Sequence, residues 1–404
     1  MQPIANALRF MRVPDQAVRA DQRPGPEDGD GYTLFTVEFD DQGWFHQDAQ
    51  RDALFRYLDQ TKDQDFLIIV FIHGWKHNAL PDDENLLSFH TLLREARQSE
   101  VQRPPPSGPR RVLGVYISWR GLTWTWPVLR ELTFFGRKAT AGRVAVGSTR
   151  EILARLKLFQ DGRQPPSGGE PQTRLILVGH SFGGLILFSA VSEYLIEGAA
   201  APGAIKPFGD LVILVNPAFE AARYQPLHTV VANRSDYDAY QRTCFIAITA
   251  TNDWATGLAF PIGRWFGTFF QSTRSRLQRR ANLNTVGHLD WMLTHELTAT
   301  GKRKPSKQGR YVGRVSGSPG DEEAEFQEFN ARYRPNGHFE PRWTRQYSSG
   351  AVLRHVKGNP DSPFWVVAAS PDVINGHNGI FGVTFLDFMR QFCDDRLRRI
   401  QGSR

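Results

Sequence analysis

Short apolar runs alternate with longer amphipathic stretches along most of the chain. An alternating run, Tyr32–Phe39, comes first, and six nearly continuous apolar runs follow it, as is typical of strands covered on both faces. The six runs are Phe66–Ile72, Val112–Ile117, Leu175–Val178, Leu211–Val215, Cys244–Thr249 and Phe364–Ala368. Helical patterns occupy Arg51–Leu58, Glu84–Arg97, Ser148–Phe159, Gly184–Ile196 and Val383–Ile400. This alternation predicts an α/β fold with a doubly wound, mostly parallel sheet.

Two intervals interrupt this rhythm. Trp119–Ala145 is rich in aromatic residues, and the last two predicted strands are separated by far more chain than an ordinary connection needs. We therefore predict four parts. Residues 1–30 form a loose lead-in, 31–255 form the first part of the core, 256–361 form a basic and aromatic cap or lid, and 362–404 complete the core with the last strand and the C-terminal helix.

The charge is concentrated in one segment. The 404-residue chain carries a formal net charge of +7. Residues 264–314 hold eleven basic and two acidic side chains, 11 − 2 = +9, so the remainder is slightly acidic. Aromatic clusters near Trp124 and Trp265 accompany basic residues, which allows contact with an anionic membrane surface. We favour the simpler interpretation, in which these aromatics pack the cap onto the sheet. No recognition motif for nucleic acid is present.

Cysteine content and hydropathy bear on the cellular compartment. Cys244 and Cys393 are the two cysteines, so at most one disulfide is possible and the fold does not depend on an oxidising compartment. We find no signal-peptide pattern at the N-terminus and no apolar run of about 18 residues. These features predict a cytoplasmic protein.

The segment Gly179-His180-Ser181-Phe182-Gly183 carries the strongest chemical signal. It has the G-x-S-x-G pattern and lies between an apolar strand and an apolar helix. A sharp strand-to-helix turn of this kind exposes the serine hydroxyl at the carboxyl edge of a sheet, and the flanking glycines leave room for the neighbouring backbone. We interpret Ser181 as a nucleophile. The alternative is a glycine-rich turn without chemical function.

A serine nucleophile needs a base, and the base needs a carboxylate. His377 lies in a Gly- and Asn-rich loop after the last predicted strand, where a general base is expected. Asp253 follows the strand that ends at Thr249 and is our prediction for the orienting carboxylate. Glu220, after another strand, and Asp372, five residues before His377, are the competing acids.

An oxyanion hole requires two backbone N–H donors. We predict the N–H groups of Phe182, which follows the nucleophile, and of Trp75, which lies in the loop after Phe66–Ile72.

The same loop permits a metal site. His73 and His77 with Asp82 or Asp83 are the candidate ligands, but their loop position argues against a shared helical face, so we predict no metal. We interpret His288, His295 and Glu296 as ordinary helix-face residues, because their order is not H-E-x-x-H.

Together these landmarks resemble the α/β-hydrolase superfamily, specifically bacterial esterase- and lipase-like serine hydrolases. The matching residues, in chain order, are His73-Gly74-Trp75, Ser118-Trp119, Gly179–Gly184, Asn252-Asp253 and His377. The resemblance implies hydrolysis of a small-molecule or lipid ester without a cofactor, through an acyl-Ser181 intermediate.

The chain also departs from the family. Arg120 stands where relatives often have proline, and Thr256–Asp361 matches nothing recognisable. The alternative function is a catalytically silent hydrolase-fold scaffold that binds a partner through the basic aromatic insertion.

Overall fold

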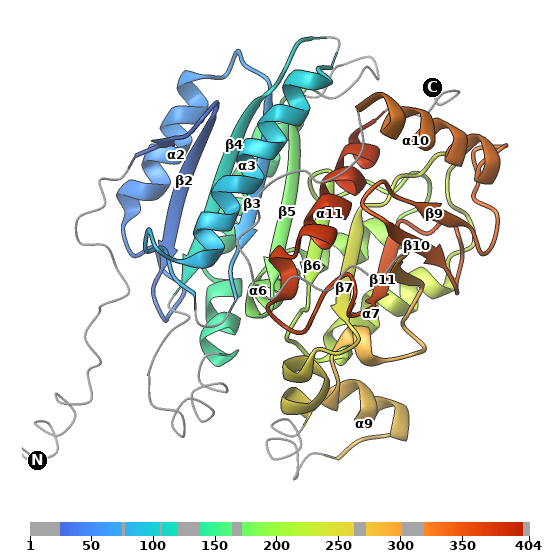
Figure 1. Cartoon of the computed structure of the whole chain (residues 1–404). Helices are drawn as coiled ribbons and strands as arrows, with labels where there is room; N and C mark the ends of the chain where they lie inside the picture. The colour runs from blue at the N-terminus through green and yellow to red at the C-terminus, as the bar shows by residue number, and fades with distance from the viewer. Residues whose placement is uncertain are drawn as a thin grey trace, which may run out of the picture.

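A single mixed sheet forms the centre of the molecule (Figure 1). The computed structural model describes residues 25–74, 77–105, 107–119, 138–163, 172–261, 272–300 and 319–398. Within them the strand order is β1-β2-β4-β3-β5-β6-β7-β11-β8-β10-β9. The strands are β1 (Glu27–Asp28), β2 (Tyr32–Phe39), β3 (Phe66–Ile72), β4 (Arg111–Trp119), β5 (Arg174–His180), β6 (Leu211–Val215), β7 (Phe245–Ala250), β8 (His295–Ala299), β9 (Thr344–Gln346), β10 (Ala351–His355) and β11 (Phe364–Ala369). Across the sheet, every pairing between β2 and β8 is parallel. The antiparallel pairings lie toward the two edges, where β1 pairs with β2, and β10 pairs with β8 and β9. The chain therefore belongs to the α/β class.

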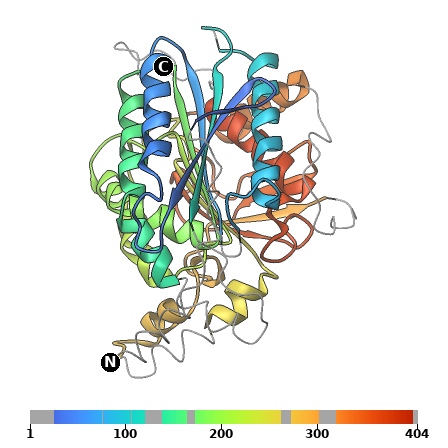
Figure 2. The same ribbon diagram turned by 90° about the vertical axis from the view of Figure 1, so that its left-hand side faces the viewer.

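Helices cover both faces of the sheet, which Figure 2 shows nearly edge-on. One face carries α2 (Asp48–Gln60), α5 (Thr149–Asp161), α6 (Phe182–Ala200) and α7 (Ala221–Asn233), and the other carries α3 (Glu84–Gln102) and α11 (Val383–Leu397). The burial of strand β3 on both faces explains why its sequence has no polar residues. Phe66, Ile68 and Val70 face the first helical layer, and Leu67 and Ile69 face the second. Side chains alternate across a strand, so a strand covered on both sides is apolar throughout.

The long interval before β11 extends the sheet instead of standing wholly apart from it. We predicted a cap at 256–361, but β8, β10 and β9 of this interval continue the sheet beyond β11. The interval also holds α9 (Arg276–Leu283), which lies beyond the carboxyl edge of the sheet, and α10 (Pro319–Tyr333), near the opposite edge (Figure 1). The prediction missed these strands because they are short and partly polar.

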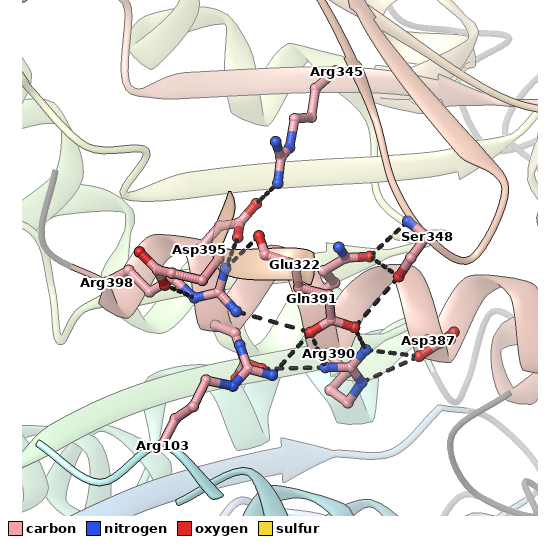
Figure 3. Close-up of polar contacts among 11 residues, drawn as sticks. Arg103, Glu322, Arg345, Ser348, Asp387, Arg390, Gln391, Asp395 and Arg398 are labelled. Atoms are coloured by element: carbon pink, nitrogen blue, oxygen red, sulfur yellow. Dashed lines mark hydrogen bonds and ion pairs between the residues drawn. The ribbon is translucent and has the colours of Figure 1, made fainter. Parts of the chain in front are cut away.

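A cluster of charged side chains holds α10 against α11 and α3 (Figure 3). Glu322 of α10 is fully buried. Its carboxylate accepts hydrogen bonds from Arg390 of α11 and, at 2.8 Å, from Arg103 at the end of α3. Arg398 donates to the Glu322 backbone carbonyl at 2.9 Å and lies 3.1 Å from Asp395. Arginine and carboxylate groups therefore fix the position of α10.

Two features bear on the predicted compartment. Among the described helices, α6 alone has the length and composition of a membrane span, with a mean hydropathy of 1.3. Its sequence contains two acidic residues, Glu193 and Glu197. The helix packs on the sheet, and 56% of its most apolar 18-residue stretch is buried. Cys244 and Cys393 are both free thiols.

Candidate active site

The topology brings four loops to one place at the carboxyl edge of the sheet. The chain leaves β3 through α3 toward β4, and leaves its neighbour β5 through α6 toward β6 on the opposite side. In open α/β sheets a crevice forms where connections diverge in this way, and ligands bind there. The loops after β3 and β5 carry Gly74 and Ser181, and those after β7 and β11 carry Asp253 and His377.

Ser181 forms the sharp turn between β5 and α6. Its backbone angles are φ 55° and ψ −118°, which are strained for a residue with a side chain. The flanking glycines, Gly179 and Gly183, are required because a Cβ atom at either position would collide with neighbouring backbone. A Cβ on Gly179 would lie 2.6 Å from the Gly183 carbonyl oxygen, and one on Gly183 would lie 2.0 Å from the carbonyl oxygen of Ile72. The predicted strand, turn and helix are therefore present around Ser181.

Ser181, His377 and Asp253 lie in a continuous hydrogen-bonded row. His377 Nε2 is 2.8 Å from Ser181 Oγ, and His377 Nδ1 is 2.8 Å from Asp253 Oδ2. An ionised carboxylate only accepts, so Nδ1 carries the proton and Nε2 accepts from the serine hydroxyl. The Asp253 side chain is fully buried, whereas the His377 side chain is 21% exposed. The structure thus brings together three side chains that are distant in the sequence.

The Asp253 carboxylate has donors on both oxygens. Oδ1 accepts from the N–H groups of Ala255 and Thr256 at 2.9 and 3.2 Å, and Oδ2 accepts from the Thr256 hydroxyl at 2.6 Å as well as from His377. Burial raises the pKa of Asp253, but the hydrogen bonds and charge of His377, together with the Thr256 donors, outweigh burial and hold the pKa below its ordinary value. Asp253 is therefore an anion at neutral pH.

Asn216 positions the loop that carries His377, and the sequence analysis did not identify it. The residue is fully buried and has φ 46° directly after β6. Its Nδ2 donates to the carbonyl of His377 at 2.8 Å and to that of Gly376 at 3.2 Å, while its Oδ1 accepts from Ala250 N at 2.8 Å. One amide thus ties the His377 loop to the end of β7. An asparagine directly after a buried strand was the available signal.

His180 and Asn252 support the same loop from either side. The N–H at His180 Nε2 donates to the His377 carbonyl at 3.1 Å, and Asn252 Oδ1 accepts from Gly376 N at 2.9 Å. Burial, and the nearby His377, lower the pKa of His180 well below its ordinary value, so the ring is neutral. His180 therefore adds no charge beside His377.

His73 anchors the loop after β3. Its ring is fully buried and stacks on Trp119. Nδ1 is 2.8 Å from the carbonyl oxygen of Gly74, and Nε2 lies 3.1 Å from both Ser118 Oγ and Trp119 N. Burial lowers the pKa of His73 to about 4. Its contacts give the histidine a structural role in this loop.

The candidate metal ligands near this loop have other partners. His77 pairs with Asp83, which also caps α3 by accepting from the N–H groups of Asn85 and Leu86. Across the described residues, no group of three or more His, Cys, Asp or Glu side chains is placed to hold a metal ion.

The remaining predicted residues divide between described and undescribed parts of the chain. Glu220 pairs with Lys138 and Arg223, and Asp372 is exposed, whereas Asp253 contacts His377. Phe182 is the first residue of α6, directly after Ser181. Trp75 and the aromatic clusters near Trp124 and Trp265 lie outside the described residues.

His295 lies on strand β8 and not on a helix, contrary to the prediction. Its buried ring packs between Trp343 and Trp365, and neighbouring Glu296 pairs with Arg354 of β10. His288 belongs to a short 3₁₀ helix, η2 (Val286–His288).

Comparison with known proteins finds similarity among solved structures. No protein-family model matches the chain, and no curated protein matches it. Among solved structures, the chain is similar to the phospholipase PlaB from Legionella pneumophila in complex with thio-NAD, with 15% sequence identity and a TM-score of 0.25. The similarity covers 59% of this chain and 47% of that chain, so this chain matches about half the length of the Legionella protein.

Proposed function

We propose that this protein is a serine hydrolase of the α/β-hydrolase type that cleaves a carboxylic ester through an acyl-Ser181 intermediate. One observation carries the proposal. The hydroxyl of a serine on a strained, glycine-flanked turn is hydrogen-bonded to an imidazole whose other nitrogen is held by a buried carboxylate. This is the arrangement that acyl transfer by a serine requires.

In the proposed reaction, Ser181 Oγ attacks the ester carbonyl carbon while His377 Nε2 takes the hydroxyl proton. Asp253 keeps the His377 ring oriented and stabilises the imidazolium. The tetrahedral intermediate collapses, the C–O bond to the alcohol breaks, and His377 returns the proton to the leaving alcohol. A water molecule then attacks the acyl-Ser181 ester with His377 again as base. This step releases a carboxylic acid and restores Ser181.

The developing oxyanion needs donors near Ser181. We assign this role to the backbone N–H groups of Phe182 and Trp75. Phe182 begins α6, whose N-terminal dipole favours negative charge at this position. Gly74 supports the placement of the second donor, because a Cβ on it would lie 2.8 Å from Ser181 Cβ. The loop preceding Trp75 therefore passes directly beside the nucleophile.

The substrate we propose is a small-molecule or lipid ester, with no cofactor and no nucleic-acid partner. The first part of the insertion, with α9 beyond the carboxyl edge of the sheet, is the part we assign as a lid (Figure 1). Basic residues on α9 also suit peripheral contact with an anionic membrane surface.

The test uses Ser181→Ala, with Ser192→Ala in helix α6 as the control. A fluorophosphonate probe should label the wild type and the control but not Ser181→Ala. Turnover of p-nitrophenyl esters should fall by about 10⁴–10⁶ in Ser181→Ala. A wild-type protein that is not labelled would favour a catalytically silent scaffold. Retention of most turnover in Ser181→Ala would exclude Ser181 as the nucleophile.

A further inference from the structure

The hydrogen-bonded row at the candidate active site continues beyond Asp253. The Thr256 hydroxyl donates to Asp253 Oδ2 at 2.6 Å, and the same oxygen lies 3.0 Å from His288 Nε2. A hydroxyl has one proton, and here it points to Asp253. His288 Nε2 must therefore carry a proton and donate to Thr256 Oγ1. This contact fixes the Nε2–H tautomer of His288.

The backbone around His288 holds the ring in this position. The η2 helix packs so closely on β7 that a Cβ on Gly287 would lie 2.0 Å from Thr249 Oγ1. On the other side, a Cβ on Gly257 would approach His288 Cε1 to 3.2 Å. The Thr256 side chain is buried, and His288 is partly buried. The pair is thus enclosed between the end of β7 and the insertion.

We propose that Thr256 and His288 are positioning residues for the candidate triad. His288 orients the Thr256 hydroxyl so that its proton points at Asp253 Oδ2. Because Thr256 is then a second donor to this oxygen, beside His377, the interaction between the carboxylate and His377 is weaker. The proposal rests on the proposed function, since it assigns a task within the same site. It also makes the insertion, which supplies His288, part of the active-site geometry.

The neighbouring charges support this assignment. Among the described residues, the titratable groups facing the pair are Asp253 and, across it, His377 and the neutral His180. Glu220, which bridges to Thr285 at the start of η2, is paired with Lys138. Burial lowers the pKa of His288, while the nearby Asp253 opposes this shift. His288 is therefore a neutral donor at the pH where a serine hydrolase acts.

Removing the second donor should strengthen the interaction between Asp253 and the His377 imidazolium. In Thr256→Val, the acid limb of the kcat/KM profile should move to higher pH by about half a pH unit, because a hydrogen bond to the charged carboxylate is lost. Thr256→Ser keeps the hydroxyl and should restore the wild-type profile. His288→Leu should move the limb in the same direction by less. The double variant should match Thr256→Val, because both residues act through one hydroxyl.

The structural prediction can be tested without turnover. Nitrogen-15 spectra of the folded wild type should show His288 as the Nε2–H tautomer, and the His377 ring-proton titration should move to higher pH in Thr256→Val. These measurements retain their meaning if the protein proves not to be an esterase. An Nδ1–H tautomer at His288, an unmoved His377 titration in folded Thr256→Val, or additive shifts in the double variant would each overturn the proposal.

Discussion

Asp253 and Glu322 are both fully buried carboxylates, but their partners differ. Asp253 accepts from one imidazole, one hydroxyl and two backbone N–H groups. Glu322 accepts from the guanidinium groups of Arg103 and Arg390 (Figure 3). Neutral donors stabilise Asp253 while leaving His377 able to gain a proton beside it. The guanidinium donors to Glu322, in contrast, are permanent cations.

Because their partners differ, we expect Asp253 to affect the reaction rate and Glu322 to affect the stability of the fold. A carboxylate whose partner changes its protonation state can assist a reaction, whereas one surrounded by arginines can only hold elements together. Loss of the first should change the rate and barely change the fold. Loss of the second should change the free energy of unfolding and leave the chemistry intact below the unfolding temperature.

The largest effect is expected for Asp253→Asn. The amide keeps the shape but cannot hold the His377 ring in the productive tautomer, so kcat for an ester should fall by about 10⁴. Steady-state kinetics with p-nitrophenyl esters would measure this fall. Glu220→Gln and Asp372→Asn are the matched controls. A larger loss in either control would mean that another carboxylate orients the base.

The second effect concerns stability. Glu322→Gln removes the buried anion that Arg103 and Arg390 share, while Asp394 still pairs with both arginines, so the free energy of unfolding should fall by up to about 3–5 kcal/mol. Urea denaturation should show this, with the ester kcat at 25 °C unchanged. Glu323→Gln, at the partly exposed neighbouring position, should change stability by less than about 1 kcal/mol. Equal losses of stability in Glu322→Gln and Glu323→Gln would mean that the buried position of Glu322 gives it no special part in stability.

A smaller kinetic effect is expected for Asn216→Gly. Glycine tolerates the φ of 46° but loses the bonds to the His377 loop, so we expect kcat/KM to fall by roughly 10- to 100-fold through misplacement of the base. Asn252→Ala removes an exposed contact to the same loop and should cost less. If Asn252→Ala had the larger effect, Asn216 would not be the main support of the loop.

The smallest effect is a pH dependence of stability. Because the folded pKa of Asp253 is lowered, its stabilising contribution is complete above the unfolded carboxyl pKa of about 4 and is lost as the pH falls through the folded value. The stability difference between wild type and Asp253→Asn should therefore shrink between pH 5 and pH 3. Urea unfolding at these two pH values would measure it. A difference that grows toward pH 3 would contradict the assigned cause.

The local pattern of the sequence was sufficient for the core of the fold. Apolar runs located the parallel strands other than β8, and the predicted helix ends near α2, α3, α5, α6 and α11 differ from the structure by a few residues. Helix α7 was not predicted, and it contains Pro226, which weakens the helical signal. Strands β8, β9 and β10 were missed because they are short and contain partly buried and exposed positions.

Some residues of the candidate site could likewise be predicted from the local sequence, and others could not. Ser181, Asp253 and His377 could be predicted because each follows a strand that is evident from the sequence, and the structure places His377 within hydrogen-bond distance of the other two. Asn216 and Thr256 also follow β6 and β7, but nothing in the local sequence shows what their side chains contact. The role of His288 depends on how the insertion returns to β7, which is a long-range property.

Ser181 and His377 are 196 positions apart in the sequence, and this separation has a consequence for the order of folding. Strands β7 and β11 are parallel neighbours with more than a hundred residues between them, so their pairing closes a long loop and should occur late. Secondary structure can therefore form while the serine is still without its imidazole. During refolding, reactivity toward a fluorophosphonate should return after the far-ultraviolet circular dichroism signal, and a nascent chain should remain inert until its final strand has joined the sheet.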